Sequence, residues 1–349
     1  MRAEPTLGWD LGGAHLKVAA VDASGRVQTA LQFACPLWQG LPELDRALQL
    51  ALAHSPEARR HAVTMTGELV DLFRDRAAGV AALVSRFGAH VPLERTLVFA
   101  SDGRFLSAAQ AVRKSDAVAS ANWLASAALV AQRVSDALFV DIGSTTTDIV
   151  PICANAVRAE GATDAERLAC EELVYTGVVR TPIMALADRI PFAGTWIEPM
   201  AEYFATTADV YRLTGELPAG VDQLPAADNG DKTVRASARR LARMVGRDGE
   251  SASPPAWRQC ARYLADVQLW RVQQACERVL SRVGMASRVS VIGAGAGRFV
   301  VKKLALRLGC RYRDFGDLVT RAGSDREWVA SCAPAVAVAL LAQQRRKKR

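Results

Sequence analysis

The chain has 349 residues, and its composition excludes several classes of protein. Half of the residues are hydrophobic, which excludes a disordered chain, and the length exceeds what one compact core usually takes. No apolar run reaches the roughly 18 residues that a membrane-spanning helix needs, and the first residues lack the pattern of a signal peptide. We therefore expect a cytoplasmic protein of two lobes that does not enter a membrane.

The net charge of +8 is concentrated at the end of the chain, because residues 345–349 read RRKKR. Without these five charges the net charge is only +3, and no basic motif interleaved with aromatic residues accompanies them. We expect the tail 345–349 to be solvated, and we expect no nucleic-acid partner. The seven cysteines form no CxxC pair, and only four histidines are present, so the sequence offers no zinc site and predicts reduced thiols.

Strand and helix patterns alternate along the first part of the chain. They predict, in order, strands at 6–11, 16–22 and 26–33, a helix at 41–54, a strand at 61–65, a helix at 75–90, a strand at 97–100 and a helix in two pieces at 107–133.

The alternation continues to the end of the chain and predicts an α/β protein. The expected elements are a hairpin at 138–152, an exposed loop rich in Gly, Pro and Asp at 214–232, helices at 233–247 and 256–283, a strand at 289–297 and a last helix at 328–344. We place the first lobe at 1–115 and the second at 116–327, with an inserted loop at 214–256. The helix at 328–344 is expected to pack back on the first lobe.

The segment LFVDIGSTTTDIVPI at 138–152 repeats the opening segment LGWDLGGAHLKVAAVD at 7–22, with an offset of 131 residues. The apolar residues on either side also align. Three pairs of positions carry the alignment, namely Asp10 with Asp141, Gly12 with Gly143, and Lys17 with Asp148. The repeat predicts two similar lobes, each of which opens with a strand, a glycine-rich turn and a returning strand.

Both turns have residue types that bind phosphate, because glycines let backbone N–H groups approach an anion and hydroxyls add donors. Asp10 and Asp141, at the ends of strands, are candidate Mg²⁺ ligands, directly or through water, and Lys17 is a candidate to neutralise phosphate charge. An ordinary β-turn explains either hairpin alone, but not two hairpins that match in register. The candidate phosphate ligands are Gly12, Gly13, Ala14, His15, Gly143, Ser144, Thr145, Thr146 and Thr147.

A third glycine segment, GAGAG at 293–297, follows a predicted strand and opens a helix. Gly293, Gly295 and Gly297 are candidates to approach a phosphate or a nucleoside. The segment does not complete the GxGxxG fingerprint, because Arg298 stands where the third glycine belongs. A dinucleotide-binding fold is therefore the weaker interpretation.

Glu68 and Asp71 lie in the loop TGELVDLF, after the strand at 61–65, and leave two interpretations open. A carboxylate at the end of a strand can face a cleft as a general base. Acidic residues before a helix can equally be N-caps or interact with the helix dipole.

The three glycine segments, in this order, resemble the phosphate-1, phosphate-2 and adenosine motifs of the superfamily of actin, Hsp70 and sugar kinases. The resemblance spans residues 6–340 and implies a duplicated, actin-like (ribonuclease H-like) fold with a cleft between two lobes. DIGSTTTDIVPI and ELVYTGVVRTP are similar to the hydantoinase/oxoprolinase branch. GWDLGGAHLKVA, MTGELVDLF, ASANWLASA and TTADVYRLTG together resemble the condensing enzymes of methanofuran biosynthesis, in tetrahydromethanopterin-linked C1 metabolism.

This last resemblance implies a transferase that joins an (aminomethyl)furan-methyl diphosphate to the phenol of γ-glutamyltyramine, or of a tyrosine analogue, with loss of diphosphate. It implies that the glycine turns hold the diphosphate and that Asp10 and Asp141 position Mg²⁺ as the cofactor. It also implies that Lys17 offsets charge on the leaving group and that Glu68 or Asp148 is the base for the phenol. ATP is less favoured, because Ala14-His15 stands where many kinases of the superfamily have Thr or Ser.

Two other functions stay open at this point. An ATP-dependent small-molecule kinase or ATPase would use the same glycine segments, whereas a non-catalytic assembly protein would use the fold to bind a partner. The long helix at 256–283 has an apolar face that can support a homodimer.

Overall fold

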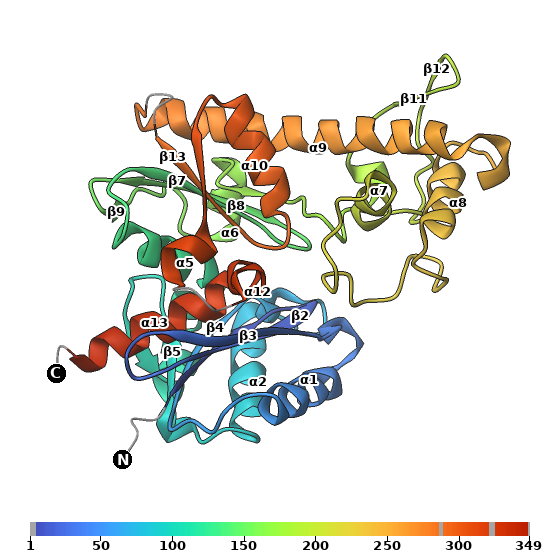
Figure 1. Cartoon of the computed structure of the whole chain (residues 1–349). Coiled ribbons are helices and arrows are strands. Elements are labelled where there is room, and N and C mark those ends of the chain that lie inside the picture. The colour runs from blue at the N-terminus through green and yellow to red at the C-terminus, as the bar shows by residue number, and fades with distance from the viewer. Residues whose placement is uncertain (1–4, 286–288, 321–324, 348–349) are drawn as a thin grey trace. The chain divides into compact units, whose positions relative to one another are not determined.

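The computed structural model of the chain describes residues 5–285, 289–320 and 325–347, and it consists of two compact units (Figure 1). Unit 1 takes its residues from 1–137, 152–164 and 313–349, and unit 2 from 138–151 and 165–312. The predicted boundary after residue 115 is therefore too early. Residues 116–137 belong to unit 1 because α5 (Asn122–Ala131) packs against α13 (Ala333–Lys347).

Unit 1 is built on a six-stranded sheet in the order β3-β2-β1-β4-β5-β6. Neighbouring strands from β3 to β1 are antiparallel, whereas β4 runs parallel to β1, and β5 runs parallel to β4. The short antiparallel edge strand β6 is not indicated by the sequence pattern. The strands are β1 (Thr6–Leu11), β2 (His15–Val21), β3 (Val27–Ala34), β4 (Arg60–Met65), β5 (Thr96–Phe99) and β6 (Phe105–Ser107).

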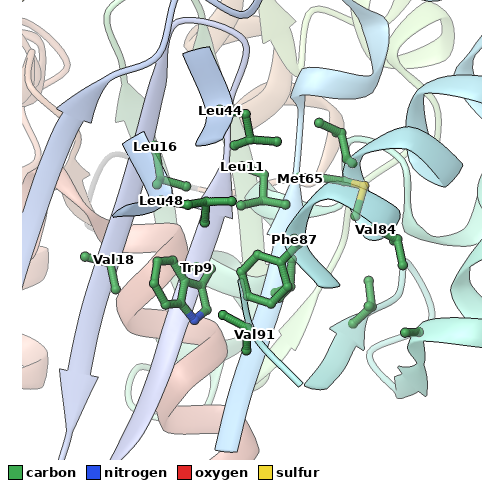
Figure 2. Packing of buried hydrophobic residues seen from close by; sticks show 14 of the residues in the cluster. Trp9, Leu11, Leu16, Val18, Leu44, Leu48, Met65, Val84, Phe87 and Val91 are labelled. Carbon is green, nitrogen blue, oxygen red and sulfur yellow. The ribbon is translucent and has the colours of Figure 1, made fainter. Parts of the chain in front are cut away.

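Side chains of β1 alternate between the two faces of this sheet. Trp9 and Leu11 point into a core that α1 (Leu41–Ala53) and α2 (Arg76–Gly88) complete (Figure 2), and Leu7 belongs to the same core. Trp9 is fully buried, and its Nε1 donates to Nδ1 of His61 over 3.1 Å. Burial lowers the pKa of His61 to about 4, so this imidazole stays neutral and can accept the bond.

The opposite face of β1 is covered by α13, which comes from the far end of the chain. The Thr6 hydroxyl donates to Oε1 of Gln343 over 2.9 Å. Gly8 lies so close to α13 that an added Cβ would be 2.0 Å from the carbonyl oxygen of Ala335. Asp10 is the next residue on this face. Helix α13 therefore helps to position the strand that carries the first candidate carboxylate.

A second sheet, which lies mostly in unit 2, has the order β10-β8-β7-β13-β14, and β9 pairs with β8. This path follows the same plan as β3-β2-β1-β4-β5, because in each sheet the first strand of the hairpin is central, with its returning strand on one side and a later strand on the other. The predicted duplicated α/β fold is confirmed. The strands are β7 (Ala137–Ile142), β8 (Thr147–Cys153), β9 (Ala156–Val157), β10 (Leu173–Val174), β13 (Ser290–Ala294) and β14 (Arg311–Asp314).

The 29-residue helix α9 (Pro254–Arg282) contributes to two separate cores of unit 2. Its second half packs with the sheet and with α10 (Arg298–Arg307). Its first half packs with α7, α8 and the β11–β12 hairpin. These last elements are α7 (Thr207–Thr214), α8 (Val234–Met244), β11 (Ile190–Phe192) and β12 (Thr195–Ile197).

The predicted exposed loop at 214–232 contains no helix or strand but is only partly exposed. Val221 and Leu224 are buried, and the Asp222 carboxylate pairs with Arg212 and Lys232. A composition rich in Gly, Pro and Asp indicates turns, but it does not show whether tertiary contacts will bury them.

The other helices are short, and the predicted solvated tail is in part helical. Helix α13 continues to Lys347, and the Arg345 guanidinium donates to the Phe105 carbonyl over 3.2 Å; Lys348 and Arg349 lie outside the described residues. The short elements are α3 (Ala108–Arg113), α4 (Ser115–Val118), α6 (Asp164–Ala169), α11 (Phe315–Val319), α12 (Arg326–Ser331), η1 (Leu37–Gln39), η2 (Gly67–Leu69), η3 (Leu93–Arg95), η4 (Ile183–Ala185) and η5 (Gly249–Ser251).

All seven cysteines are free thiols in the structure. Within the described ranges, no helix combines the length and the apolar character that crossing a membrane requires.

The substitution Gly8→Ala is expected to destabilise the fold, because the new Cβ would collide with the backbone of α13. Overpacking of a core typically costs about 1–3 kcal/mol, and we expect a lower midpoint of thermal unfolding. The control is Gly103→Ala, where the Cβ meets no atom within 4 Å and only the positive φ of 77° is unfavourable, at a cost of about 1 kcal/mol. An equal loss of stability in both variants would contradict the close contact between β1 and α13.

Candidate functional site

A row of polar residues crosses three strands of unit 1 at the end of β1. Asp10 faces Lys17 in β2 and Thr64 in β4, and Nζ of Lys17 is 3.5 Å from Oδ2 of Asp10. The aspartate is only 3 % exposed, so the lysine inside the returning strand supplies the compensating charge that a buried carboxylate needs. Sequence reasoning missed Thr64, a fully buried residue whose place near the end of the next parallel strand was the available signal.

The first glycine turn, Gly12–His15, closes with a hydrogen bond of 3.1 Å from the Gly12 N–H to the His15 carbonyl. Two carbonyls of this turn are occupied by the segment before η1, because the Leu37 N–H donates to Gly13 and the Cys35 N–H donates to Ala14. The N–H groups of Gly13 and Ala14 donate to no residue in the described part of the chain. The N–H and C=O of a trans peptide point in opposite directions, so the Ala14 N–H, which shares its peptide with the occupied Gly13 carbonyl, points away from that contact.

The second glycine turn, Gly143–Thr146, closes in the same way. It closes with a hydrogen bond of 2.9 Å from the Gly143 N–H to the Thr146 carbonyl, at the predicted offset of 131 residues from the first turn. The N–H groups of 178–180 donate to the carbonyls of Gly143 and Ser144 over 2.8–3.1 Å. The N–H groups of Thr145 and Thr146 bond to none of the described residues. The internal repeat inferred from the sequence is thus confirmed at the level of hydrogen bonds.

Each turn therefore presents two unused backbone donors, an arrangement that binds anions. A side chain at Gly12 would place Cβ 2.7 Å from the His15 carbonyl oxygen, which explains the glycine at this position. The ring of His15 is itself buried, at 4 % exposure, so this residue takes part in the turn through its backbone.

The hydroxyls of the second turn fall into two groups. Ser144, Thr145 and Thr146 are partly exposed, so their hydroxyls can reach a ligand. Thr147 is fully buried and donates to the Thr176 carbonyl over 2.7 Å. The prediction of Thr147 as a phosphate ligand is therefore wrong, because its only hydroxyl hydrogen is used inside the unit.

A buried glutamine on α9 supports the loop that lies against the second turn. Nε2 of Gln268 donates to the Thr176 hydroxyl over 2.7 Å and to the Gly177 carbonyl over 2.8 Å, and its Oε1 accepts from the Tyr211 hydroxyl. Gly177 is in turn so close to the turn that an added Cβ would be 2.4 Å from the Thr145 nitrogen. Sequence reasoning missed Gln268, since a polar residue in a long helix carries no signal of burial.

Asp148, a predicted general base, belongs to a chain of buried charges in unit 2. Arg167 donates to Oδ1 of Asp148 over 2.8 Å and to the Glu172 carbonyl over 2.9 Å, and Arg282 donates to the Glu172 carboxylate over 2.5 Å. Arg167 is only 1 % exposed, so removing its partner would leave a buried charge without compensation. These contacts explain Asp148 as the partner of Arg167, and its role as a base stays a prediction.

The third glycine segment packs against the strand that carries Asp141. An added Cβ at Gly295 would be 2.3 Å from Oδ1 of Asp141, and this glycine has a positive φ of 80°. At Gly297 the Cβ would collide with Ile142, and at Gly293 with the ring of Tyr312. Close packing therefore accounts for all three glycines, and their contact with a phosphate or nucleoside stays a prediction.

Glu68 lies in η2, directly after β4, and is 1 % exposed, whereas Asp71 is exposed. Neither residue caps α2. That position belongs to Asp75, whose Oδ1 accepts from the Ala78 N–H over 2.8 Å, so the N-cap interpretation is wrong. The Ser120 hydroxyl oxygen lies within hydrogen-bond distance of Oε1 of Glu68, at 2.9 Å.

A metal ion at Asp10 or Asp141 would need other oxygen ligands. Among the described residues, no group of three or more His, Cys, Asp or Glu side chains comes together. Mg²⁺ usually keeps several waters and binds through one or two carboxylates together with substrate phosphates. One buried carboxylate next to a turn with unused backbone donors, as found in each unit, would fit this pattern if a phosphorylated ligand were bound.

Residues 59–344 match the family model of the hydantoinase/oxoprolinase proteins. Over 299 residues the chain is 29% identical to the (4-{4-[2-(gamma-L-glutamylamino)ethyl]phenoxymethyl}furan-2-yl)methanamine synthase of Methanocaldococcus jannaschii, a match that covers 85% of this chain and 87% of that protein. Over 85 residues it is 44% identical to the protein of the same name from Methanococcus vannielii, covering 24% of this chain and 38% of that one.

A solved structure of similar fold is the nucleotide-free form of acetone carboxylase, described under ATP-dependent acetone carboxylation. It has a TM-score of 0.57 and 11% identity, and the match covers 97% of this chain and 70% of that chain. At this identity the likeness shows the fold alone.

The substitution Gln268→Leu is expected to destabilise unit 2, because it leaves the Tyr211 hydroxyl without its buried partner and removes one hydrogen bond each from the Thr176 hydroxyl and the Gly177 carbonyl. Each unsatisfied buried group costs about 1–3 kcal/mol. The matched control is Gln273→Leu on the same helix, where Oε1 is buried and accepts no hydrogen bond from the described residues. Thermal unfolding should show a clearly larger loss for Gln268→Leu; equal losses would remove Gln268 from the support of the loop.

Proposed function

The chain belongs to the hydantoinase/oxoprolinase family, and we propose that within this family it is a transferase. The proposed enzyme forms an aryl-alkyl ether in methanofuran-type cofactor synthesis. The reaction joins an (aminomethyl)furan-methyl diphosphate to the phenol of γ-glutamyltyramine, or of a tyrosine analogue, and releases diphosphate. The observation that carries this proposal is the similarity to the Methanocaldococcus jannaschii synthase, which extends over 87% of that protein.

The name of that synthase describes its product, and the product defines the bond that must form. A phenoxymethyl group on a furan is an ether between a phenol oxygen and the carbon attached to the ring. Formation of this bond removes the phenol proton and requires a leaving group on the furan-methyl carbon. Diphosphate is a suitable leaving group, and the proton and the diphosphate balance the reaction.

The two glycine turns support a diphosphate as that leaving group. Each turn offers two backbone N–H groups that no described residue uses, and the second adds the partly exposed hydroxyls of Ser144, Thr145 and Thr146. Donors held in place by the surrounding loops need no rearrangement when charge develops on the departing oxygen, which is how fixed donors lower a barrier.

Lys17 and Asp10 are proposed to act beside the first turn. The lysine side chain is 20 % exposed and its Nζ is 3.5 Å from the Asp10 carboxylate, so the cation is held in place but can still reach solvent or a ligand. We expect it to offset charge on the leaving diphosphate. When bound, Mg²⁺ would be held by Asp10 or Asp141 together with phosphate oxygens and would stabilise the same charge.

The furan-methyl carbon makes departure of the diphosphate the main barrier, because the ring oxygen can donate electrons to the positive charge that develops there. The phenol, with an ordinary pKa near 10, must lose its proton during the reaction. Asp148 is paired with Arg167 and Glu68 is 1 % exposed. We therefore expect the departing diphosphate itself to be a candidate acceptor for this proton.

The test is an assay with two arms. The purified protein is mixed with Mg²⁺, the furan-methyl diphosphate and γ-glutamyltyramine, and in parallel with Mg²⁺ and ATP. We expect the ether and diphosphate to form in the first arm without ATP. Formation of ADP or phosphate in the second arm alone would support a kinase or ATPase instead, and no turnover in either arm would support an assembly protein. A cytoplasmic location and a homodimer stay predictions of the sequence.

The substitution Lys17→Met is expected to weaken the binding of Mg²⁺-diphosphate by roughly ten- to a hundredfold, because a charge-assisted contact contributes about 1.5–3 kcal/mol. Isothermal titration calorimetry measures the affinity. The matched control is Lys232→Met, since Lys232 is also a partly exposed lysine paired with an aspartate, Asp222, but lies in the 214–232 region. Unchanged affinity in Lys17→Met would show that this lysine only compensates the charge of Asp10.

A further inference from the structure

Four polar side chains of unit 1 form a chain of hydrogen bonds behind the first turn. The Ser120 hydroxyl lies 2.9 Å from Oε1 of Glu68 and 3.0 Å from Oδ2 of Asp164. Arg76, at the start of α2, donates to the same Oδ2 of Asp164 over 2.7 Å. The chain connects η2, the turn before α5, the first residue of α6 and α2.

The number of hydrogens in this chain determines which groups are charged. A serine hydroxyl carries one hydrogen and can donate to only one of its two carboxyl neighbours. If both carboxyls were ionised, one of the two oxygen–oxygen contacts would lack a hydrogen. If Glu68 is protonated, it donates to Ser120, which donates to Asp164, and every contact then has its hydrogen. Arg76 identifies Asp164 as the ionised end, because it compensates the charge there.

The surroundings of Glu68 also favour the protonated form of its carboxyl. The residue is 1 % exposed, and its Oε2 accepts no hydrogen bond from any described residue. An unpaired carboxylate oxygen is far more costly to bury than the carbonyl oxygen of a neutral acid. Burial is also the main reason why the pKa of Glu68 is raised, and the charged groups that face it are Arg76 and Asp164.

Ser120 has an unusual backbone that these hydrogen bonds hold in place. Its φ is 49°, in the left-handed region that residues other than glycine rarely adopt. The conformation lies in the turn between α4 and α5, where the Ser120 hydroxyl lies between the two carboxyls. Such a conformation persists where the surroundings determine it.

Glu68 is also connected to the first turn through its neighbours. The Thr66 N–H donates to the Leu11 carbonyl over 3.0 Å. A Cβ added at Gly67 would lie 3.1 Å from that carbonyl oxygen and 3.4 Å from the Gly12 carbonyl carbon, so this residue lies directly against the turn. On its other side, the backbone of Glu68 is in contact with Gly79 of α2. A fixed Glu68 side chain therefore fixes the segment that supports the turn.

We propose that Glu68 is a neutral carboxylic acid that donates a hydrogen bond to Ser120. We also propose that the chain Glu68–Ser120–Asp164–Arg76 positions the first glycine turn. Glu68 is then a positioning residue and not the base that the sequence predicts. The protonation state is independent of the reaction, whereas the positioning role rests on the proposed function.

The protonation state is tested by infrared difference spectroscopy of the wild type against Glu68→Gln at about pH 8, where ordinary carboxyls are ionised. We expect the carbonyl stretch of a protonated acid in the wild type and its loss in the variant. The control is Asp75→Asn, which removes an exposed carboxyl and should change no such band. A difference spectrum with only carboxylate bands would overturn the proposal.

The pH dependence of unfolding provides a second measurement. A carboxyl with a raised pKa binds its proton more tightly in the folded state, so its contribution to stability falls as the pH rises from the ordinary glutamate range to the folded pKa. The stability of the wild type relative to Glu68→Gln should therefore decrease between about pH 5 and about pH 8. A constant difference over this range would contradict a neutral Glu68.

The positioning role is tested by the affinity for inorganic diphosphate with Mg²⁺. Glu68→Gln keeps a neutral donor for Ser120 and should bind as the wild type does, whereas Ser120→Ala breaks the chain and should bind roughly tenfold more weakly. Equal affinities would limit the cluster to a structural role. If the wild type itself binds no diphosphate, the proposed function fails while the infrared result still decides the protonation of Glu68.

Discussion

The occupied carbonyls of the two glycine turns are the constraint on which both candidate sites depend. In each turn the segment that follows the hairpin donates its N–H groups to those carbonyls: Cys35 and Leu37 in unit 1, and 178–180 in unit 2. The peptide planes that carry these carbonyls are thereby oriented, and the unused N–H groups of Ala14 and Thr145, which lie in two of these planes, point to the other side. Without these loops the same glycines would be free to rotate, and their flexibility would oppose the binding of an anion.

The hairpins and their repeat could be predicted because they are local features of the sequence. Two strands around a glycine turn need only neighbouring residues to form, and the offset of 131 residues is reproduced by the closing hydrogen bonds of both turns. The pairing of Asp10 with Lys17 follows from the register of one hairpin. Even the order of the second sheet follows from the first once the repeat is known.

The roles of single polar side chains could not be predicted, because they depend on residues distant in the chain. Thr147 lies in a run of four hydroxyl residues, and only the position of the Thr176 carbonyl separates it from the others. Asp148 pairs with Arg167, and Glu68 contacts Ser120, a residue 52 positions away. The predicted boundary of the first lobe is wrong for the same reason, since α13, near the end of the chain, packs against α5, which lies in the middle of the chain.

The repeat has preserved the backbone of the turn but not the charge beside it. Lys17 pairs with Asp10 within the first hairpin, whereas the matching residue of the second hairpin, Asp148, pairs with Arg167 outside it. A site that uses backbone donors tolerates such divergence, because its donors do not depend on side-chain identity. The first turn thus has a cation beside it, and the second has neutral hydroxyls. The two turns therefore differ in the side-chain contacts that each can give an anion: a full positive charge beside the first, and hydrogen bonds from hydroxyls beside the second.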